Sequence, residues 1–116
     1  MPLRLKRRAE FKAVARGVRV GRDAFTLQAL RRDDALPPRV GFTVTKKTGN
    51  AVVRNRIKRR LRALCDTASR FEPGTDYVIV ARRGALNAKH EDLAAALTAA
   101  IGASGKKLQR ARDGNA

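Results

Sequence analysis

The chain has 116 residues, enough for one compact domain and too few for two. It carries 27 Lys and Arg against 10 Asp and Glu, a formal charge of +17 that a compact fold tolerates better when a polyanion offsets it. A single cysteine and a single histidine exclude an internal disulfide and a Cys/His metal cluster, and no apolar run of about 18 residues predicts a membrane span. We therefore expect a nucleic-acid partner, no membrane and, because the N-terminus lacks a signal-peptide pattern, a cytoplasmic location.

A short helix is predicted between Leu5 and Gly17. Phe11, Val14 and Ala15 follow helical spacing there, and Gly17 is a typical residue at a helix C-terminus.

Three segments that follow have the patterns of strands. F-T-L-Q-A-L after Ala24 alternates apolar and polar residues, and R-V-G-F-T-V-T after Pro38 repeats that alternation. D-Y-V-I-V-A after Thr75 is typical of a more fully buried strand. The side chains predicted to face inward from the first two strands are Phe25, Leu27, Ala29, Val40, Phe42 and Val44.

Between the last two strands lies a basic helix. Asn50 can cap a helix that begins after Gly49. At 100° per residue, its apolar residues form one stripe about 80° wide, which we expect to pack on the sheet. The stripe consists of Val53, Ile57, Leu61, Leu64 and Ala68. Asn55, Arg59 and Arg62 face away from it, with Arg56 and Lys58 on the two shoulders of that outward side. Arg54 and Arg60 flank the stripe with guanidinium groups expected to reach outward.

The charge of this helix distinguishes it from an ordinary solvated surface. Eight cations and no acid lie between Lys46 and Arg62, whereas a solvated helix usually interleaves Glu with Lys and Arg. A helix for the DNA major groove would need a second helix a short turn away or dimerising heptads, and the sequence predicts neither. RNA phosphates are the better target.

One more helix is predicted near the end, from the spacing of Leu93, Leu97, Ala100 and Ile101. After it, G-A-S-G-K-K and a polar run predict a flexible basic tail over residues 103–116, so that residues 1–102 form one RNA-binding domain. The order of elements predicts an α+β fold, a two-layer sandwich with one βαβ unit.

The segment K-K-T-G-N-A-V-V-R-N-R-I-K-R-R-L-R, Lys46 to Arg62, closely resembles the signature of the bacterial ribonuclease P protein subunit. R-L-K-R-R-A-E-F-K-A-V before it, P-R-V-G-F-T-V-T leading into it and D-Y-V-I-V-A-R after it are similar to the family in order and spacing. The resemblance covers roughly residues 3 to 101.

The resemblance implies more than the residue patterns do. It implies a mostly antiparallel four-stranded sheet with three helices and a left-handed βαβ crossover, against the general right-handed preference. It implies a protein that binds a catalytic RNA and the 5′ leader of precursor tRNA. In such an enzyme the RNA carries out the chemistry, and the holoenzyme needs divalent metal (Mg²⁺) held mainly by RNA. We therefore expect no catalytic residue and no metal ligand in this chain. No obligate protein partner is expected either.

Family positions also imply two sets of contact residues. The RNA-binding set is Lys46, Lys47, Arg54, Asn55, Arg56, Lys58, Arg59 and Arg62, and the leader-binding set is Phe11, Thr26, Gln28, Thr43, Arg54 and Lys58. Some members of the family carry aromatics at two further positions, where this chain has Ala15 and Gln28. We therefore expect leader contacts here to depend more on charge and hydrogen bonds than on base stacking.

Other interpretations remain for particular residues and for the whole chain. Phe11 has the spacing of a core residue, Cys65 is expected to be buried and inert, and His90 is expected at the start of the last helix as a surface or capping residue. A structural RNA-binding protein of ribosomal type or a non-specific nucleic-acid chaperone would share the basic helix. An autonomous nuclease is disfavoured because no pair of acids has a spacing suited to acid/base or two-metal chemistry.

Overall fold

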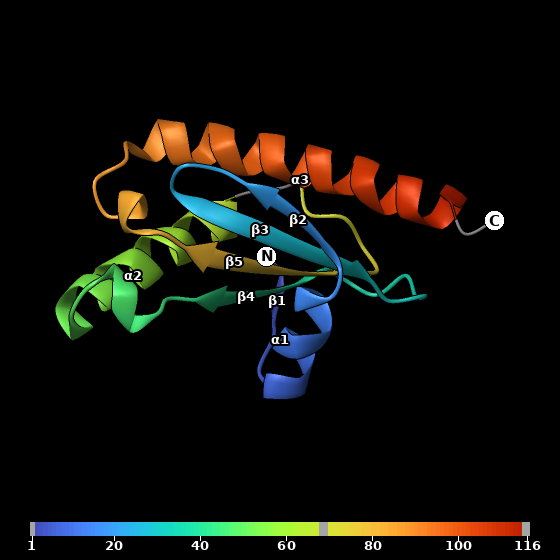
Figure 1. Cartoon of the computed structure of the whole chain (residues 1–116), viewed down its shortest axis with the longest axis horizontal. Helices are drawn as coiled ribbons and strands as arrows, with labels where there is room; N and C mark the ends of the chain where they lie inside the picture. The colour runs from blue at the N-terminus through green and yellow to red at the C-terminus, as the bar shows by residue number, and fades with distance from the viewer. Residues whose placement is uncertain (1, 68–69, 115–116) are drawn as a thin grey trace.

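The computed structural model describes residues 2–67 and 70–114 of the chain. In chain order the elements are β1 (Leu3–Arg4), α1 (Arg8–Ala15), β2 (Val18–Gly21), β3 (Phe25–Arg31), β4 (Arg39–Thr43), the 3₁₀ helix η1 (Lys46–Thr48), α2 (Ala51–Thr67), β5 (Thr75–Ala81), the 3₁₀ helix η2 (Arg83–Ala85) and α3 (His90–Gly114). Figure 1 shows α3 running along one side of the sheet, α1 on the other side and α2 at one end of the molecule.

The strands form one mixed sheet in the order β1-β4-β5-β3-β2. β4 pairs in parallel with both β1 and β5, whereas β3 pairs antiparallel with both β5 and β2. The helix α2 is the crossover that joins the parallel neighbours β4 and β5. The predicted α+β class, the three helices and the βαβ unit are confirmed.

The predicted four-stranded, mostly antiparallel sheet needs a correction. The described residues form five strands, and the pairings divide equally between parallel and antiparallel. The two strands that the sequence analysis missed are the sheet's edges, β1 with 2 residues and β2 with 4. Such short segments hold too few residues for an alternating pattern to be recognised.

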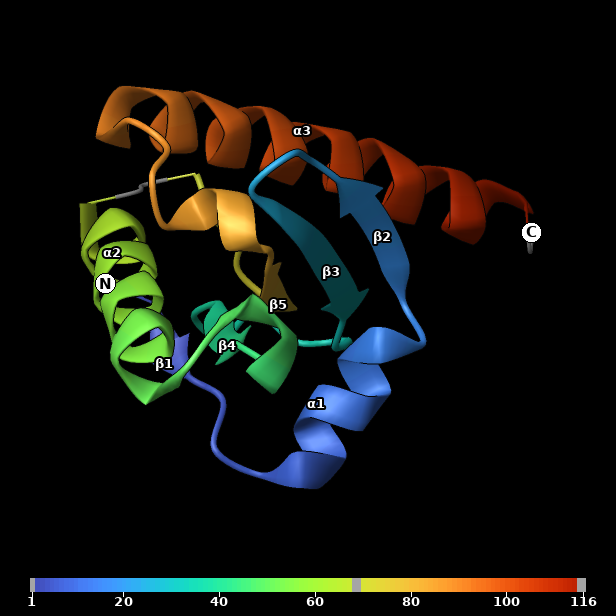
Figure 2. The same cartoon turned by 60° about the vertical axis from the view of Figure 1, so that its left-hand side comes forward.

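The main core lies between the sheet and the pair α2 and α3. Phe25, Leu27 and Ala29 of β3 are fully buried in it, as the alternation predicted. The remaining contributors include Val40 and Ile79 of the sheet, Ile57, Leu61 and Leu64 of α2, and Leu93, Leu97, Ala100 and Ile101 of α3. Figure 2 shows α3 across the top of the view, along β2 and β3, and α2 at the left, near β1 and β4.

A smaller core holds α1 on the opposite face of the sheet. Val14 is fully buried there against Leu5 and Val78. Phe11 is half-buried beside them, while Ala15 is exposed although the helical spacing placed it on the same side. The sheet thus has one face covered by two helices and another covered only in part by α1.

The predicted flexible tail is wrong for the part of it that the structure describes. Residues 103–114 continue α3, and residues 115–116 lie outside the described residues. Ser104 is fully buried and Leu108 is 8% exposed, one helical turn apart on the inner side of the helix. Packing of these two side chains against the core outweighs the low helix propensity of Gly102 and Gly105.

An ion-pair network fixes the ends of β4 and β5 farthest from α2. Asp76 is 4% exposed and accepts hydrogen bonds from Arg39, with Nε–Oδ1 at 2.8 Å and Nη2–Oδ2 at 2.6 Å. Arg32 pairs with Asp76 and with Asp34, and Arg39 also pairs with Glu10 of α1. The network joins α1, β4, β5 and the loop after β3.

Among the described residues, no helix has the length and apolar character needed to cross a membrane.

Candidate nucleic-acid interface

The start of α2 is fixed by Gly49 and Asn50. Gly49 adopts φ 146°, and a Cβ there would lie 2.8 Å from Cγ1 of Val53, so only glycine fits. The Asn50 side chain then caps the helix, because its Oδ1 accepts a 3.0 Å hydrogen bond from the backbone N–H of Val53. The predicted cap is confirmed, and it determines the direction in which the helix leaves the sheet.

The apolar stripe of α2 faces the core as predicted. Ile57 and Leu61 are fully buried, Leu64 is 2% exposed, and Val53 packs at the margin. Ala68, the last residue of the predicted stripe, lies outside the described residues. Burial of this stripe fixes the rotation of the helix about its axis and therefore the direction of its polar side chains.

The opposite side of α2 is exposed and cationic. Asn55, Arg56, Lys58, Arg59 and Arg62 are all exposed; we call these five residues the α2 cationic surface. Lys46 and Lys47 of η1 are exposed as well. Within residues 2–67 and 70–114, none of these cations lies within ion-pair distance of an acid whose side chain is described. The charge is therefore available to an external anion.

Arg54 and Arg60 flank the stripe, but their environments differ. The Arg60 guanidinium does not reach into solvent as expected: it donates hydrogen bonds to the carbonyls of Ala85 at 2.7 Å and Leu86 at 2.8 Å, and to Ala88. Arg60 therefore holds η2 and the turn after it. Arg54 lies on the other flank, where its Nε is enclosed without a hydrogen-bond partner among the described atoms.

The predicted leader-binding residues other than Arg54 and Lys58 gather on the sheet face that carries α1. Register places Thr26 and Thr43 on either side of Val80, and Gln28 and Gly41 on either side of Val78. Phe11 lies over Gly41, where a built Cβ would be only 2.5 Å from the ring. We call Phe11, Thr26, Gln28 and Thr43 the α1-face set.

In the described part of the chain, Arg54 and Lys58 are not bonded to the α1-face set. No hydrogen bond or ion pair between described residues joins either of them to that set. Because Arg60 occupies the flank of α2 toward η2, Arg54 and Lys58 occupy the opposite flank, as 100° steps require.

Arg82 is a residue of this face that the sequence analysis did not identify. It follows β5, is exposed, and its Nη2 donates a 3.1 Å hydrogen bond to Oγ1 of Thr26. The alternation of Val78 and Val80 continues to Arg82, so the signal was present in the sequence. Arg82 therefore places a guanidinium group beside the α1-face set, whose four members are uncharged.

Three acids, Glu10, Asp34 and Asp76, gather in the ion-pair network described above. Glu10 accepts hydrogen bonds from the backbone N–H groups of Arg7 at 2.9 Å and Lys6 at 3.1 Å, which, with nearby Arg39, lower the pKa of its carboxyl. Hydrogen bonds from Arg32 likewise lower the pKa of Asp34. Both acids belong to the network around Asp76, at the ends of β4 and β5 remote from α2.

The structure also places the single cysteine and the single histidine. No group of three or more His, Cys, Asp or Glu side chains among the described residues could hold a metal ion. Cys65 is buried as predicted, and burial raises the pKa of its thiol to about 12. His90 begins α3 as predicted and is exposed. The exposed charged side chains that α2 and η1 present at this interface are arginines and lysines, which bind anions.

Comparison with known proteins gives a consistent result. Residues 2–104 match the family model described as Ribonuclease P. The "Ribonuclease P protein component" of Gluconacetobacter diazotrophicus is 56% identical over 84 residues, covering 70% of this chain and 72% of that protein. The protein of the same name from Brucella suis is 44% identical over 115 residues, covering 90% of this chain and 82% of that protein.

Solved structures agree with the fold. The RNase P protein of Staphylococcus aureus superposes with a TM-score of 0.75 at 26% identity, covering 90% of this chain and 96% of that one. The RNase P protein of Thermotoga maritima has a TM-score of 0.72 at 21% identity, covering 84% and 94%, and supports the fold alone.

Proposed function

The chain belongs to the ribonuclease P protein family, and from this membership we propose that it is the protein subunit of a ribonucleoprotein that removes the 5′ leader from precursor tRNA. The catalytic RNA carries out the hydrolysis in this proposal, with Mg²⁺ held mainly by RNA. The protein binds both RNAs in the cytoplasm.

The observation that carries the proposal is the α2 cationic surface. Its guanidinium and ammonium groups project from a helix whose rotation is fixed by Ile57 and Leu61, so they form an ordered array. Arginine donates paired hydrogen bonds that match phosphate oxygens, and each neutralised phosphate releases counterions. We assign Lys46, Lys47, Arg54, Asn55, Arg56, Lys58, Arg59 and Arg62 to RNA contact.

The α1-face set is assigned to the leader. Phe11 offers a half-exposed ring for stacking, and half-buried Thr43 offers a hydroxyl on the adjoining strand. Thr26 and Gln28 are each only 8% exposed, so they contribute polar groups beneath this surface. Arg54 and Lys58 supply charge from the flank of α2. With Ala15 exposed in place of a second aromatic, a single ring is available on α1, which favours charge and hydrogen bonds over stacking.

Reconstitution tests the proposal. The purified protein, the ribonuclease P RNA of the same organism and a precursor tRNA are combined at low Mg²⁺, and cleavage is followed with leaders of increasing length. The proposal predicts that the protein stimulates cleavage and that affinity rises stepwise as the leader reaches the α1 face.

Three control outcomes would contradict it. A structural RNA-binding protein would not stimulate cleavage, and a non-specific chaperone would bind single-stranded DNA equally well with no leader-length step. Cleavage by the protein without RNA would revive an autonomous nuclease.

A further inference from the structure

An open cavity of about 710 Å³ lies at the end of the molecule away from α2, lined by three arginines and three acids: Arg31, Arg32 and Arg112, with Asp33, Asp34 and Glu72. The cavity lies between the end of β3, the turn at Glu72 to Gly74 and the last turns of α3. Figure 1 places α2 and the C-terminal end of α3 at opposite ends of the longest axis, which measures 45 Å.

Arg31 reaches the cavity because of its position in β3. It continues the face that carries Leu27 and Ala29, so its side chain emerges where the core ends beneath α3. The next residue, Arg32, points to the other face and is neutralised by Asp34 and Asp76. Of these two adjacent arginines, only Arg31 therefore brings uncompensated charge.

Arg112 is carried by a well-anchored part of α3. Ser104 and Leu108 are buried below it, and Nζ of Lys107 donates a 2.5 Å hydrogen bond to the carbonyl of Arg19 in β2. These contacts fix the rotation of the helix, which places Arg112 on the side toward the cavity and Lys107 on the side toward β2.

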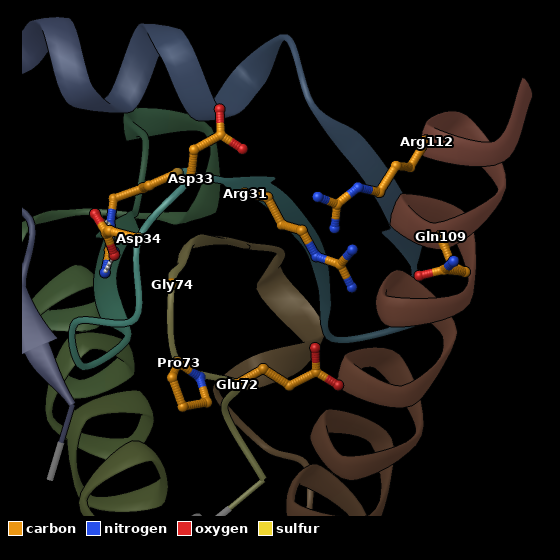
Figure 3. A pocket seen from close by; sticks show the side chains of 9 residues that line it. Arg31, Asp33, Asp34, Glu72, Pro73, Gly74, Gln109 and Arg112 are labelled. Carbon is orange, nitrogen blue, oxygen red and sulfur yellow. Dashed lines mark hydrogen bonds and ion pairs between the residues drawn. The ribbon is translucent and has the colours of Figure 1, made fainter. Parts of the chain in front are cut away.

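The guanidinium groups of Arg31 and Arg112 point toward one another across the cavity (Figure 3). Neither lies within ion-pair distance of an acid whose side chain the structure describes, although Asp33 and Glu72 line the same cavity, as does Asp34, which pairs with Arg32. Two facing cations repel each other, and an anion between them would remove that repulsion.

We infer that the cavity between Arg31 and Arg112 binds a phosphodiester of RNA. The inference rests on the proposed function and extends it to a second contact at the far end of the molecule. Two guanidinium forks match phosphate oxygens, and RNA bound at α2 belongs to a polymer large enough to reach both ends of a 45 Å protein. Phosphate contacts at both ends would fix the orientation of the protein on its RNA.

The test uses the full chain with Arg31→Gln and Arg112→Gln combined. Binding is measured across a salt series in two arms, one with the catalytic RNA alone and one with the assembled holoenzyme and precursor tRNA. The slope of log affinity against log salt should fall in one arm by about 1.4 to 1.8, for two lost phosphate contacts. The arm in which the slope falls identifies the RNA that supplies the phosphate.

Two further variants make the result specific. Glu72→Gln removes one of the carboxylates that compete with the anion, and it should tighten binding by about two- to fivefold, the range of single partly exposed charge interactions. Lys106→Gln with Arg110→Gln removes equal charge from exposed positions of the same helix outside the cavity lining, and it should change the slope much less. Unfolding midpoints establish that each variant is folded.

Unchanged slopes in both arms for the folded Arg31/Arg112 variant would overturn the inference, as would equal effects of the two double variants. Weaker binding by Glu72→Gln would contradict it as well. These outcomes leave the proposed function standing if the wild-type protein stimulates cleavage. Failure of the wild-type protein to do so would instead refute the proposed function.

Discussion

The ring of Phe11 in α1 lies directly on the backbone of Gly41 in β4. A Cβ at Gly41 would come within 2.5 Å of both Cε1 and Cζ of that ring, and within 3.2 Å of Cβ of Leu5. The absence of a side chain at Gly41 therefore determines how close α1 sits to the sheet and where the only ring of the α1-face set is presented.

Gly41→Ala should displace Phe11 and alter the α1 face. Overpacking at this position should lower the free energy of unfolding by about 1 to 3 kcal/mol, measured by urea denaturation. Affinity for precursor tRNA with a long leader should fall, while affinity for the catalytic RNA stays unchanged. Gly102→Ala is the control: nothing lies within 4 Å of a Cβ there, so it should stabilise the helix by about 0.5 to 1 kcal/mol.

Arg60 and Arg59 are neighbours in sequence with opposite expected behaviour. Arg60→Ala removes the hydrogen bonds to Ala85, Leu86 and Ala88, and should destabilise the fold by about 1 to 3 kcal/mol. Arg59→Ala removes an exposed side chain and should change stability by less than about 0.5 kcal/mol. Denaturant unfolding of both variants tests the distinction, and similar losses of stability would contradict it.

The sequence predicted the parts of the fold that depend on local patterns. Alternation identified β3 and β4, and an apolar run typical of a more fully buried strand identified β5. The Asn50 cap and the apolar stripe identified α2 with its exposed side. Burial of Ile57 and exposure of Arg59 follow from the same 100° geometry.

What the sequence did not predict depends on distant partners. Steps of 100° per residue give the direction in which Arg60 leaves the helix axis. They do not reveal the carbonyl groups, 25 to 28 residues away, that accept its hydrogen bonds. Gly102 and Gly105 predicted a flexible tail because helix propensity depends only on the local sequence. The helix continues through them because tertiary packing holds Leu108. The ion pairs of Asp76 span 37 and 44 residues, a separation that no local pattern reports.

Glu10 should make the stability of α1 dependent on pH. Its pKa in the folded chain lies below the ordinary value of 4.5, so its carboxylate stabilises the fold above about that pH, and the contribution is lost as the pH falls through the folded value. Glu10→Gln should therefore be less stable than wild type at pH 7, with the difference shrinking toward pH 3. Unfolding curves at the two pH values measure this, and a constant difference would exclude the carboxylate as its source.

Cys65 should resist alkylation while the protein is folded. With a pKa of about 12, only about one thiol in ten thousand is ionised at pH 8, and the side chain is 2% exposed. Iodoacetamide at pH 8 should label the denatured chain readily and the native chain very slowly, as followed by mass spectrometry. Rapid labelling of the native protein would contradict the burial of this face of α2.

The central claim is that the exposed cations of α2 bind RNA phosphates, and the salt dependence of binding tests it most directly. The variant Arg56→Ala with Arg59→Ala is compared with the control Arg22→Ala with Lys89→Ala, which removes equal charge near the acids Asp23 and Asp92. Binding to the catalytic RNA is measured from low to physiological salt. The α2 variant should remain folded by circular dichroism and lose about 1.4 to 1.8 from the slope of log affinity against log salt, while the control keeps the wild-type slope. An unchanged slope in the folded α2 variant would contradict the claim.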